Sequence, residues 1–123
     1  MLLKILQVQE RKDIMAEKQL IQKQLPENAD ILEEIYDFMN QKSWVFISAD
    51  LFGRLKEKYA WKFAKNSDRC HFFVDKHRKQ WKVTVNTDGR WNNVEIIAVI
   101  NCQKSSDFEQ YYTSDPEKIV FLE

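Results

Sequence analysis

The chain has 123 residues, 44% of them hydrophobic and 13% aromatic, and a formal net charge of zero. This composition is typical of a folded chain and excludes intrinsic disorder. Two cysteines are too few for a disulfide framework, and no apolar run approaches the roughly 20 residues that span a bilayer. We therefore expect an intracellular protein, cytoplasmic or nuclear, with no cofactor and no membrane contact.

The charges are distributed unevenly along the chain. Residues 54–90 hold eleven Lys and Arg against four acidic residues, whereas residues 1–53 and 91–123 both carry a net negative charge. A basic centre between acidic ends indicates an anionic partner, although a solvated basic surface explains the same pattern.

Residues 2–24 have the composition of a helix, with Leu, Lys, Gln and Glu and without Gly or Pro. The apolar stripe of this segment is interrupted by acidic residues, so a coiled coil is not indicated. We expect residues 1–25 to be an N-terminal helical extension that packs on the domain or forms a homodimer. Residues 26–123 then form a single α+β domain.

Two further helices and a short strand follow. Asp30 and Glu33 form a capping pair at the start of an amphipathic helix that ends near residue 42. Residues 44–47 read Trp-Val-Phe-Ile, which predicts a short buried strand. Ser48 or Asp50 caps the next helix, which reaches about Phe63 and directs Leu51 and Leu55 inward.

Residues 69–80 fit two structures. Cys70, Phe73, Val74 and His77 follow the i, i+3, i+4, i+7 spacing of a helical face, whereas residues 71–74 have strand composition. The helix is favoured because its apolar positions and Trp81 share one side.

Residues 81–99 predict a β-hairpin whose turn is Asp88-Gly89. This turn pairs Trp81 with Ile96 and Val83 with Val94, which places all four side chains on one face. Beyond the hairpin we expect one or two helical turns at residues 107–112 and a final edge strand at residues 119–122. We expect the core to unite Ile35, Phe38, Leu51, Leu55, Trp81 and Val83.

This order of elements resembles the winged helix-turn-helix superfamily over roughly residues 30–100. The resemblance implies an α+β fold with N-terminal helices packed on a small antiparallel sheet. It also implies that helix 67–80 enters a nucleic-acid groove while hairpin 81–99 contacts the backbone. The segment between Tyr59 and Ser67 departs from the pattern, since it holds Trp61 and Phe63 and no glycine.

The candidate binding residues follow from this arrangement. The outward side of helix 69–80 would hold Arg69, Phe72, Lys76 and Lys79, and cations around an exposed aromatic ring suit a nucleic acid. Alternatively, Phe72 packs on the N-terminal helix. Arg90 and Trp91 lie at the expected hairpin tip, where they would reach nucleic acid. Alternatively, Trp91 folds back across Asn86.

Metal and catalytic sites are weakly indicated. Cys70, His71 and His77 match no common zinc spacing. His71 and Asp75 lie one helical turn apart, but no nucleophile accompanies them, and we expect neither a metal nor an enzyme.

Two functions remain open. The first is a small nucleic-acid-binding regulatory protein of winged-helix type, with DNA as the expected target. The second is a protein-protein interaction module, an inhibitor or adaptor, that uses Phe72, Trp91 and the N-terminal helix.

Overall fold

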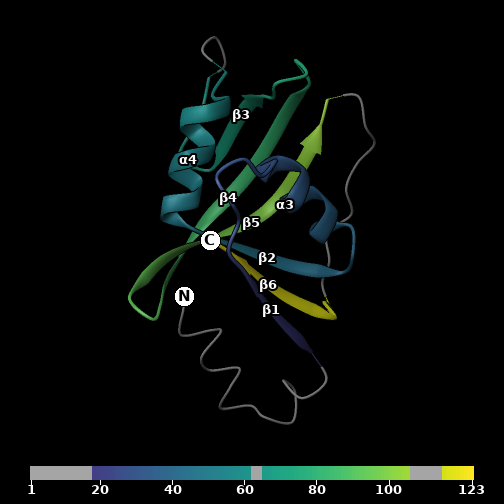
Figure 1. Cartoon of the computed structure of the whole chain (residues 1–123), viewed down its shortest axis with the longest axis vertical. Helices are drawn as coiled ribbons and strands as arrows, with labels where there is room; N and C mark the ends of the chain where they lie inside the picture. The colour runs from purple at the N-terminus through teal and green to yellow at the C-terminus, as the bar shows by residue number, and fades with distance from the viewer. Residues whose placement is uncertain (1–17, 62–64, 106–114) are drawn as a thin grey trace.

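The computed structural model describes residues 18–61, 65–105 and 115–123, and in them a six-stranded mixed sheet carries two helices on one face (Figure 1). The sheet order is β1-β6-β2-β5-β4-β3. Strands β1, β6 and β2 are mutually parallel, whereas β2, β5, β4 and β3 pair antiparallel. The elements are β1 (Gln19–Lys23), α3 (Ile31–Met39), β2 (Ser43–Ser48), α4 (Ala49–Tyr59), β3 (Cys70–Val74), β4 (Gln80–Trp91), β5 (Val94–Lys104) and β6 (Lys118–Leu122).

This architecture contradicts the winged-helix expectation. A winged helix packs three helices on a small hairpin, whereas here the sheet is the largest element and α3 and α4 are the helices of the described residues. Neither of them is long and apolar enough to cross a membrane.

Both helices begin where their caps predict. The Asp30 carboxylate accepts the Glu33 backbone N–H at the start of α3, and Ser48 Oγ accepts the Leu51 N–H at 3.0 Å at the start of α4. These contacts satisfy backbone donors that have no partner within the helix. Helix α4 ends at Tyr59, a turn earlier than expected, because Ala60 and Trp61 pair with β3.

The helix expected over residues 2–24 is wrong for residues 19–23, which form β1. Strand β1 pairs in parallel with β6, with Gln19 opposite Lys118 and Lys23 opposite Leu122. Residues 2–17 of that segment lie outside the described residues, as does the expected helical turn at residues 107–112. Residues 119–122 do form a strand, but β6 lies between β1 and β2, so it is not an edge strand.

The helix expected over residues 69–80 is also wrong. The segment forms β3, a loop at residues 75–79 and the start of β4. Phe73 pairs with Trp81 and turns toward the helices, where it is buried. The helical spacing of the apolar residues is therefore coincidental, and β-strand alternation together with burial of Phe73 determines the structure.

The β4–β5 hairpin turns at Asn92-Asn93, not at Asp88-Gly89. Both asparagines have positive φ, 49° and 66°, as a type I′ turn requires. Asp88 and Gly89 instead occupy an irregularity in the pairing, where Gly89 has a φ of 93°.

The register of the hairpin therefore differs from the predicted one, and it pairs Trp81 with Lys104 and Val83 with Cys102. The predicted common face is therefore wrong: Trp81 and Val83 face the helices, whereas Val94 and Ile96 lie in a separate cluster on the opposite face.

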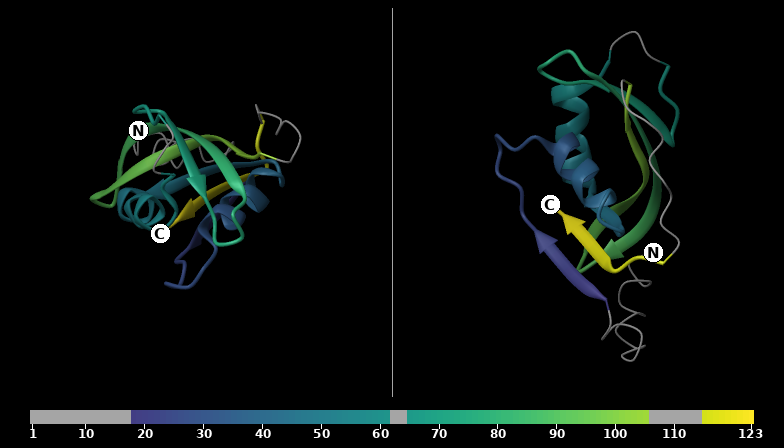
Figure 2. Two further views of the ribbon diagram at one scale, coloured as in Figure 1. Left: turned by 90° about the horizontal axis from the view of Figure 1, so that it is seen from above. Right: turned by 90° about the vertical axis from the view of Figure 1, so that its right-hand side faces the viewer.

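The sheet has two differently covered faces. The helix face is the one packed against α3 and α4, and its cluster includes all six expected core residues, with Phe38 only partly buried. The opposite, outer face holds a smaller cluster of Phe46, Trp91, Ile96, Ile119 and Phe121. The long strands β4 and β5 curve around the helices (Figure 2).

Candidate functional site

A cleft of about 310 Å³ opens at the end of the sheet where β3 ends, β4 begins and β5 ends. Its described lining is Trp61, Phe72, Gln80, Trp81, Lys82, Gln103, Lys104 and Ser105. Phe73, Trp81 and Cys102 are in the helix-face core, so alternation directs Phe72, Lys82 and Gln103 to the outer face. Phe72 lies opposite Lys82, and Lys82 lies opposite Gln103, which makes one row across three strands.

Trp61 forms one wall of this cleft. Ala60 makes a β-bridge with Phe73, and the Trp61 backbone N–H donates to the Phe72 carbonyl at 3.2 Å. The indole contacts the Phe72 ring edge-on, with the ring centroids 6.4 Å apart and the planes at 76°. The two rings thus form an aromatic corner, because one ring stands nearly perpendicular to the other. Both rings are only partly buried.

The Asn66 and Ser67 side chains fix the start of β3. Asn66 Oδ1 accepts the Phe72 N–H at 2.8 Å, and Ser67 Oγ accepts the Cys70 N–H at 3.0 Å. These bonds satisfy N–H groups of β3, which is an edge strand. The backbone of Phe72 is therefore held on both sides, because its carbonyl accepts the Trp61 N–H and its own N–H donates to the Asn66 side-chain oxygen.

The loop at residues 75–79 is organised by the buried carboxylate of Asp75. Asp75 accepts hydrogen bonds from the backbone N–H groups of His77 and Lys79 and, at 3.0 Å, from Trp81 Nε1. Burial alone would raise the pKa of Asp75, but these three donors outweigh that effect and hold the pKa below its ordinary value. Because its oxygens are engaged in the turn, Asp75 is a structural group here.

Exposed cations surround the cleft. Lys82 lines it, and Lys76 and Arg78 lie in the adjoining loop, while Lys65 and Arg69 precede β3. Lys79 is half-buried. Within the described part of the chain, no ion pair neutralises these side chains. Among the described residues 65–82, Asp68 is the exposed acid, so this stretch of the chain carries an excess of exposed positive charge.

The structure separates the six residues expected to bind nucleic acid. Arg69, Phe72, Lys76 and Lys79 lie on β3 or beside it, although on strands and loops instead of one helical side. Arg90 lies near the other end of β4, eight residues beyond Lys82, which is roughly 25 Å in a strand. Trp91 is 5% exposed and packs on Phe121 with centroids 5.0 Å apart. Of the two alternatives, an exposed tip is therefore wrong for Trp91, which folds back onto the sheet, although onto Phe121 and not across Asn86.

Of the eight described residues that line the cleft, Phe72 alone was among the residues predicted to bind nucleic acid. Trp61 was noted only as a departure from a helix-turn-helix joint. Strand pairing brings Lys82 and Gln103 beside Phe72. The residues next to them in the sequence do not indicate this pairing.

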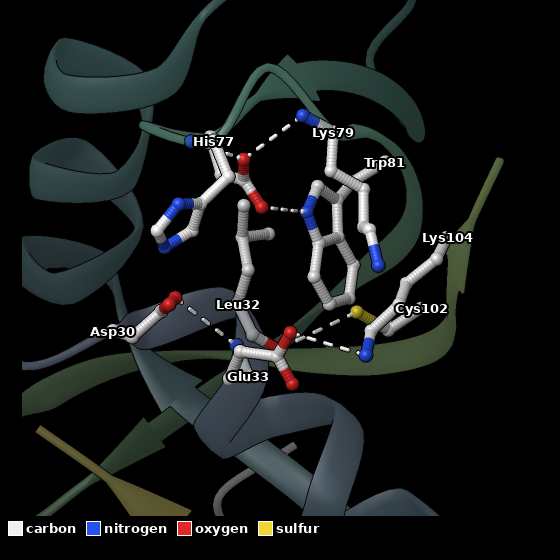
Figure 3. A network of polar contacts seen from close by, with 9 residues as sticks. Asp30, Leu32, Glu33, His77, Lys79, Trp81, Cys102 and Lys104 are labelled. Carbon is white, nitrogen blue, oxygen red and sulfur yellow. Dashed lines mark hydrogen bonds and ion pairs between the residues drawn. The ribbon is translucent and has the colours of Figure 1, made fainter. Parts of the chain in front are cut away.

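A second polar cluster lies on the helix face below the same loop. Lys104 Nζ is 3.1 Å from Glu33 Oε1, and it also lies over the Tyr36 and Trp81 rings at 4.4 and 5.2 Å from their centroids. Burial raises the pKa of the neighbouring Cys102 thiol far above its ordinary range, so the thiol stays protonated. Figure 3 shows the Lys104 ammonium beside the Glu33 carboxylate and the Cys102 sulfur directed toward the Leu32 carbonyl. This arrangement stabilises the packing of α3 on the sheet.

The weak metal and base candidates are not assembled in the described residues. His71 packs between Phe52 and Phe73, and His77 is exposed in the loop. Four residues of strand separate His71 from Asp75 by roughly 13 Å. No cluster of three metal-ligating side chains occurs among the residues that the structure describes.

Comparison of the chain with known proteins gives no match to a family model, to a curated protein or to a solved structure. The functional argument therefore rests on the aromatic cleft and the cations around it.

Proposed function

We propose that the protein is a nucleic-acid-binding module whose contact surface is the cleft and the basic loop between β3 and β4. The observation that carries the proposal is the position of Lys82 on the outer face, opposite Phe72 and in the same cleft as Trp61. A cation and aromatic rings in one cleft match the two parts of a nucleotide, the phosphate and the base.

The local clustering of exposed cations, and not the net charge of the chain, supports an anionic ligand. The chain is neutral overall, but the exposed Lys76, Arg78 and Lys82 all lie within seven residues at one end of the sheet. Local positive potential, and not total charge, draws phosphates to a surface and releases their counterions. The acidic residues Glu33, Glu34 and Asp37 lie on α3, which disfavours that helix as the contact surface.

The mode of binding differs from that of a winged helix. Residues 69–80 supply a strand and a loop, so the proposal uses no recognition helix. The alternative of a protein-interaction module relied partly on Trp91, which is buried, and on the N-terminal segment, of which residues 1–17 lie outside the described residues. Among the aromatic contacts it named, Phe72 remains accessible, and it lies in the basic cleft.

The test is salt-dependent binding of a fluorescently labelled mixed-sequence oligonucleotide, measured by anisotropy with the full chain. Affinity should fall as salt rises from about 50 to about 200 mM. The double variant Lys76→Ala/Lys82→Ala should bind more weakly and lower the log–log salt slope by about 1.4 for a single strand.

The matched control removes two cations elsewhere. Lys23 lies on β1 at the opposite edge of the sheet and pairs with Glu34 at 2.6 Å, and Arg90 lies at the far end of β4. Lys23→Ala/Arg90→Ala removes the same charge and should leave the salt slope close to that of the parent. Equal losses in both double variants would show that only overall charge matters. Absence of salt-dependent binding in the parent would reject the proposal and favour the protein-interaction module.

A further inference from the structure

We infer that the cleft accepts an unpaired base, so that the protein binds single-stranded nucleic acid in preference to duplex. This inference rests on the proposed function and specifies the ligand of the same site. Its basis is the aromatic corner of Trp61 and Phe72 together with the Lys82–Gln103 row beside it.

The geometry of the aromatic corner determines which ligand can make the most favourable contacts with it. With the two planes at 76°, a flat ring stacked on one aromatic face meets the other aromatic ring with its edge. Stacked and edge-on contacts are both favourable aromatic geometries. A base in a duplex already has both faces covered by its neighbours, so only an unpaired base can present a face to this corner.

The polar residues of the cleft suit the rest of a nucleotide. Gln103 carries an amide that donates and accepts hydrogen bonds, as the edge of a base requires. Lys82, directly opposite Gln103 on β4, carries a cation for the adjoining phosphate. Gln80 and Ser105 continue the lining toward the loop that bears Lys76 and Arg78, which gives the following phosphates a basic path.

Helix α3 and the β4–β5 hairpin are unsuited to entering the groove of a duplex. Helix α3 presents acidic residues, and its apolar side is buried against the sheet. At the tip of the β4–β5 hairpin, Arg90 lies opposite Glu95 and donates to the Asn93 carbonyl at 2.6 Å. Trp91 beside it is buried. The cleft thus combines accessible aromatic rings with the exposed Lys82, whereas the Lys18 ammonium that lies over the exposed Trp44 ring is paired with Asp115.

The first experiment compares labelled strands of about 12 nucleotides, in DNA and in RNA, with duplexes of the same sequences. Single strands should bind the full chain at least about fivefold more tightly than their duplexes. Equal or tighter duplex binding would overturn the inference while leaving the proposed function standing. No salt-dependent binding to any probe would remove the proposed function itself.

The second experiment tests stacking at Trp61. Trp61→Ala should weaken single-strand binding by roughly 5- to 100-fold, in line with loss of one stacked base. The salt slope should stay unchanged because no charge is removed. Trp61→Phe should retain most of the affinity, and Trp44→Phe, a change at an exposed tryptophan on β2, should bind like the parent. Unaltered affinity in Trp61→Ala would overturn the inference.

A third measurement needs no change at Trp61. In the Trp44→Phe variant the remaining tryptophans are Trp61, Trp81 and Trp91, and the last two are buried. Single-stranded oligonucleotide should therefore quench the emission of the accessible Trp61 and protect it from acrylamide. Binding by anisotropy without either change would overturn the inference even if Trp61→Ala fails to fold.

Discussion

The two faces of the sheet are built from alternate residues of the same strands, yet they are covered differently. The helix face is closed along its length by α3 and α4, with Ile35, Leu55 and Val83 fully buried. The outer face is closed at one end, where Trp91 packs on Phe121, and open at the other, where Phe72 and Lys82 line a cleft. The comparison teaches that the outer-face cluster and the candidate binding surface lie toward opposite ends of β4, whereas Trp81 belongs both to the helix-face core and to the lining of the cleft.

The largest expected effect is on the helix face. Leu55→Ala should lower the free energy of unfolding by about 2–5 kcal/mol, because Leu55 is 0% exposed and its removal leaves a cavity between α4 and the sheet. Chemical denaturation measures the change. Leu20→Ala, at a site 38% exposed on β1, is the control and should cost far less. Equal costs would contradict the described position of α4.

A smaller effect is expected at the junction of the helix face and the basic loop. Trp81→Phe keeps an aromatic ring but removes the indole donor to Asp75, and loss of a hydrogen bond to a charged group costs about 1.5–3 kcal/mol. The pKa of Asp75 lies below its ordinary value of 3.8, so the ionised group stabilises the fold above that pH. This contribution disappears as pH falls through the lowered pKa.

The difference between parent and Trp81→Phe should therefore be largest above about pH 4 and shrink below it. Urea denaturation at a series of pH values measures this. A difference that is independent of pH down to strongly acidic solution would mean that only ring packing was lost.

The closed end of the outer face should behave like the main core. Ile47 on the helix face and Ile96 on the outer face are both 0% exposed. Ile47→Val and Ile96→Val should each cost about 0.5–1.5 kcal/mol, since each removes one buried methylene. Thermal or chemical denaturation of the two variants compares how tightly the two faces are packed. A neutral Ile96→Val beside a costly Ile47→Val would show that the outer cluster is only loosely packed.

The smallest effect on stability is expected at the open end. Gln103 is partly exposed and lines the cleft, so Gln103→Ala should change the free energy of unfolding by no more than about 0.5 kcal/mol. Single-strand binding should nevertheless weaken, because the amide is lost from the cleft. If Gln103→Ala destabilised the protein but left single-strand binding unchanged, the open end of the outer face would not be the binding surface.

The sequence predicted the elements that depend on local signals. Asp30 and Ser48 are caps followed by amphipathic segments, so α3, β2 and α4 could be located from the chain alone. The prediction failed for two different reasons. Gln19–Lys23 has helical composition but pairs with the distant strand β6. Cys70–Val74 was assigned to a helix from the spacing of its apolar residues, although residues 71–74 have strand composition and pair with the neighbouring strand β4.

The same reason limits the prediction of the site. Arg69, Phe72 and Lys76 were predicted because they are close in sequence and basic or aromatic, and of these Phe72 lines the cleft. Their partners were not found, since the contact of Phe72 with Trp61 depends on β3 being an edge strand and that of Lys82 with Gln103 depends on a hairpin register. Asn-Asn and Asp-Gly both suit tight turns, and choosing the wrong one moved every pair in the hairpin.

The position of β6 also has a consequence for folding kinetics. Gln19 pairs with Lys118 and Trp44 pairs with Ile119, so closing this side of the sheet joins segments far apart in the chain. In contrast, β3, β4 and β5 form consecutive hairpins from nearby residues. Because local contacts close faster than distant ones, the meander that carries the cleft should form early and the insertion of β6 should limit the folding rate. The cleft would then be assembled on the pathway before the strand that completes the rest of the sheet arrives.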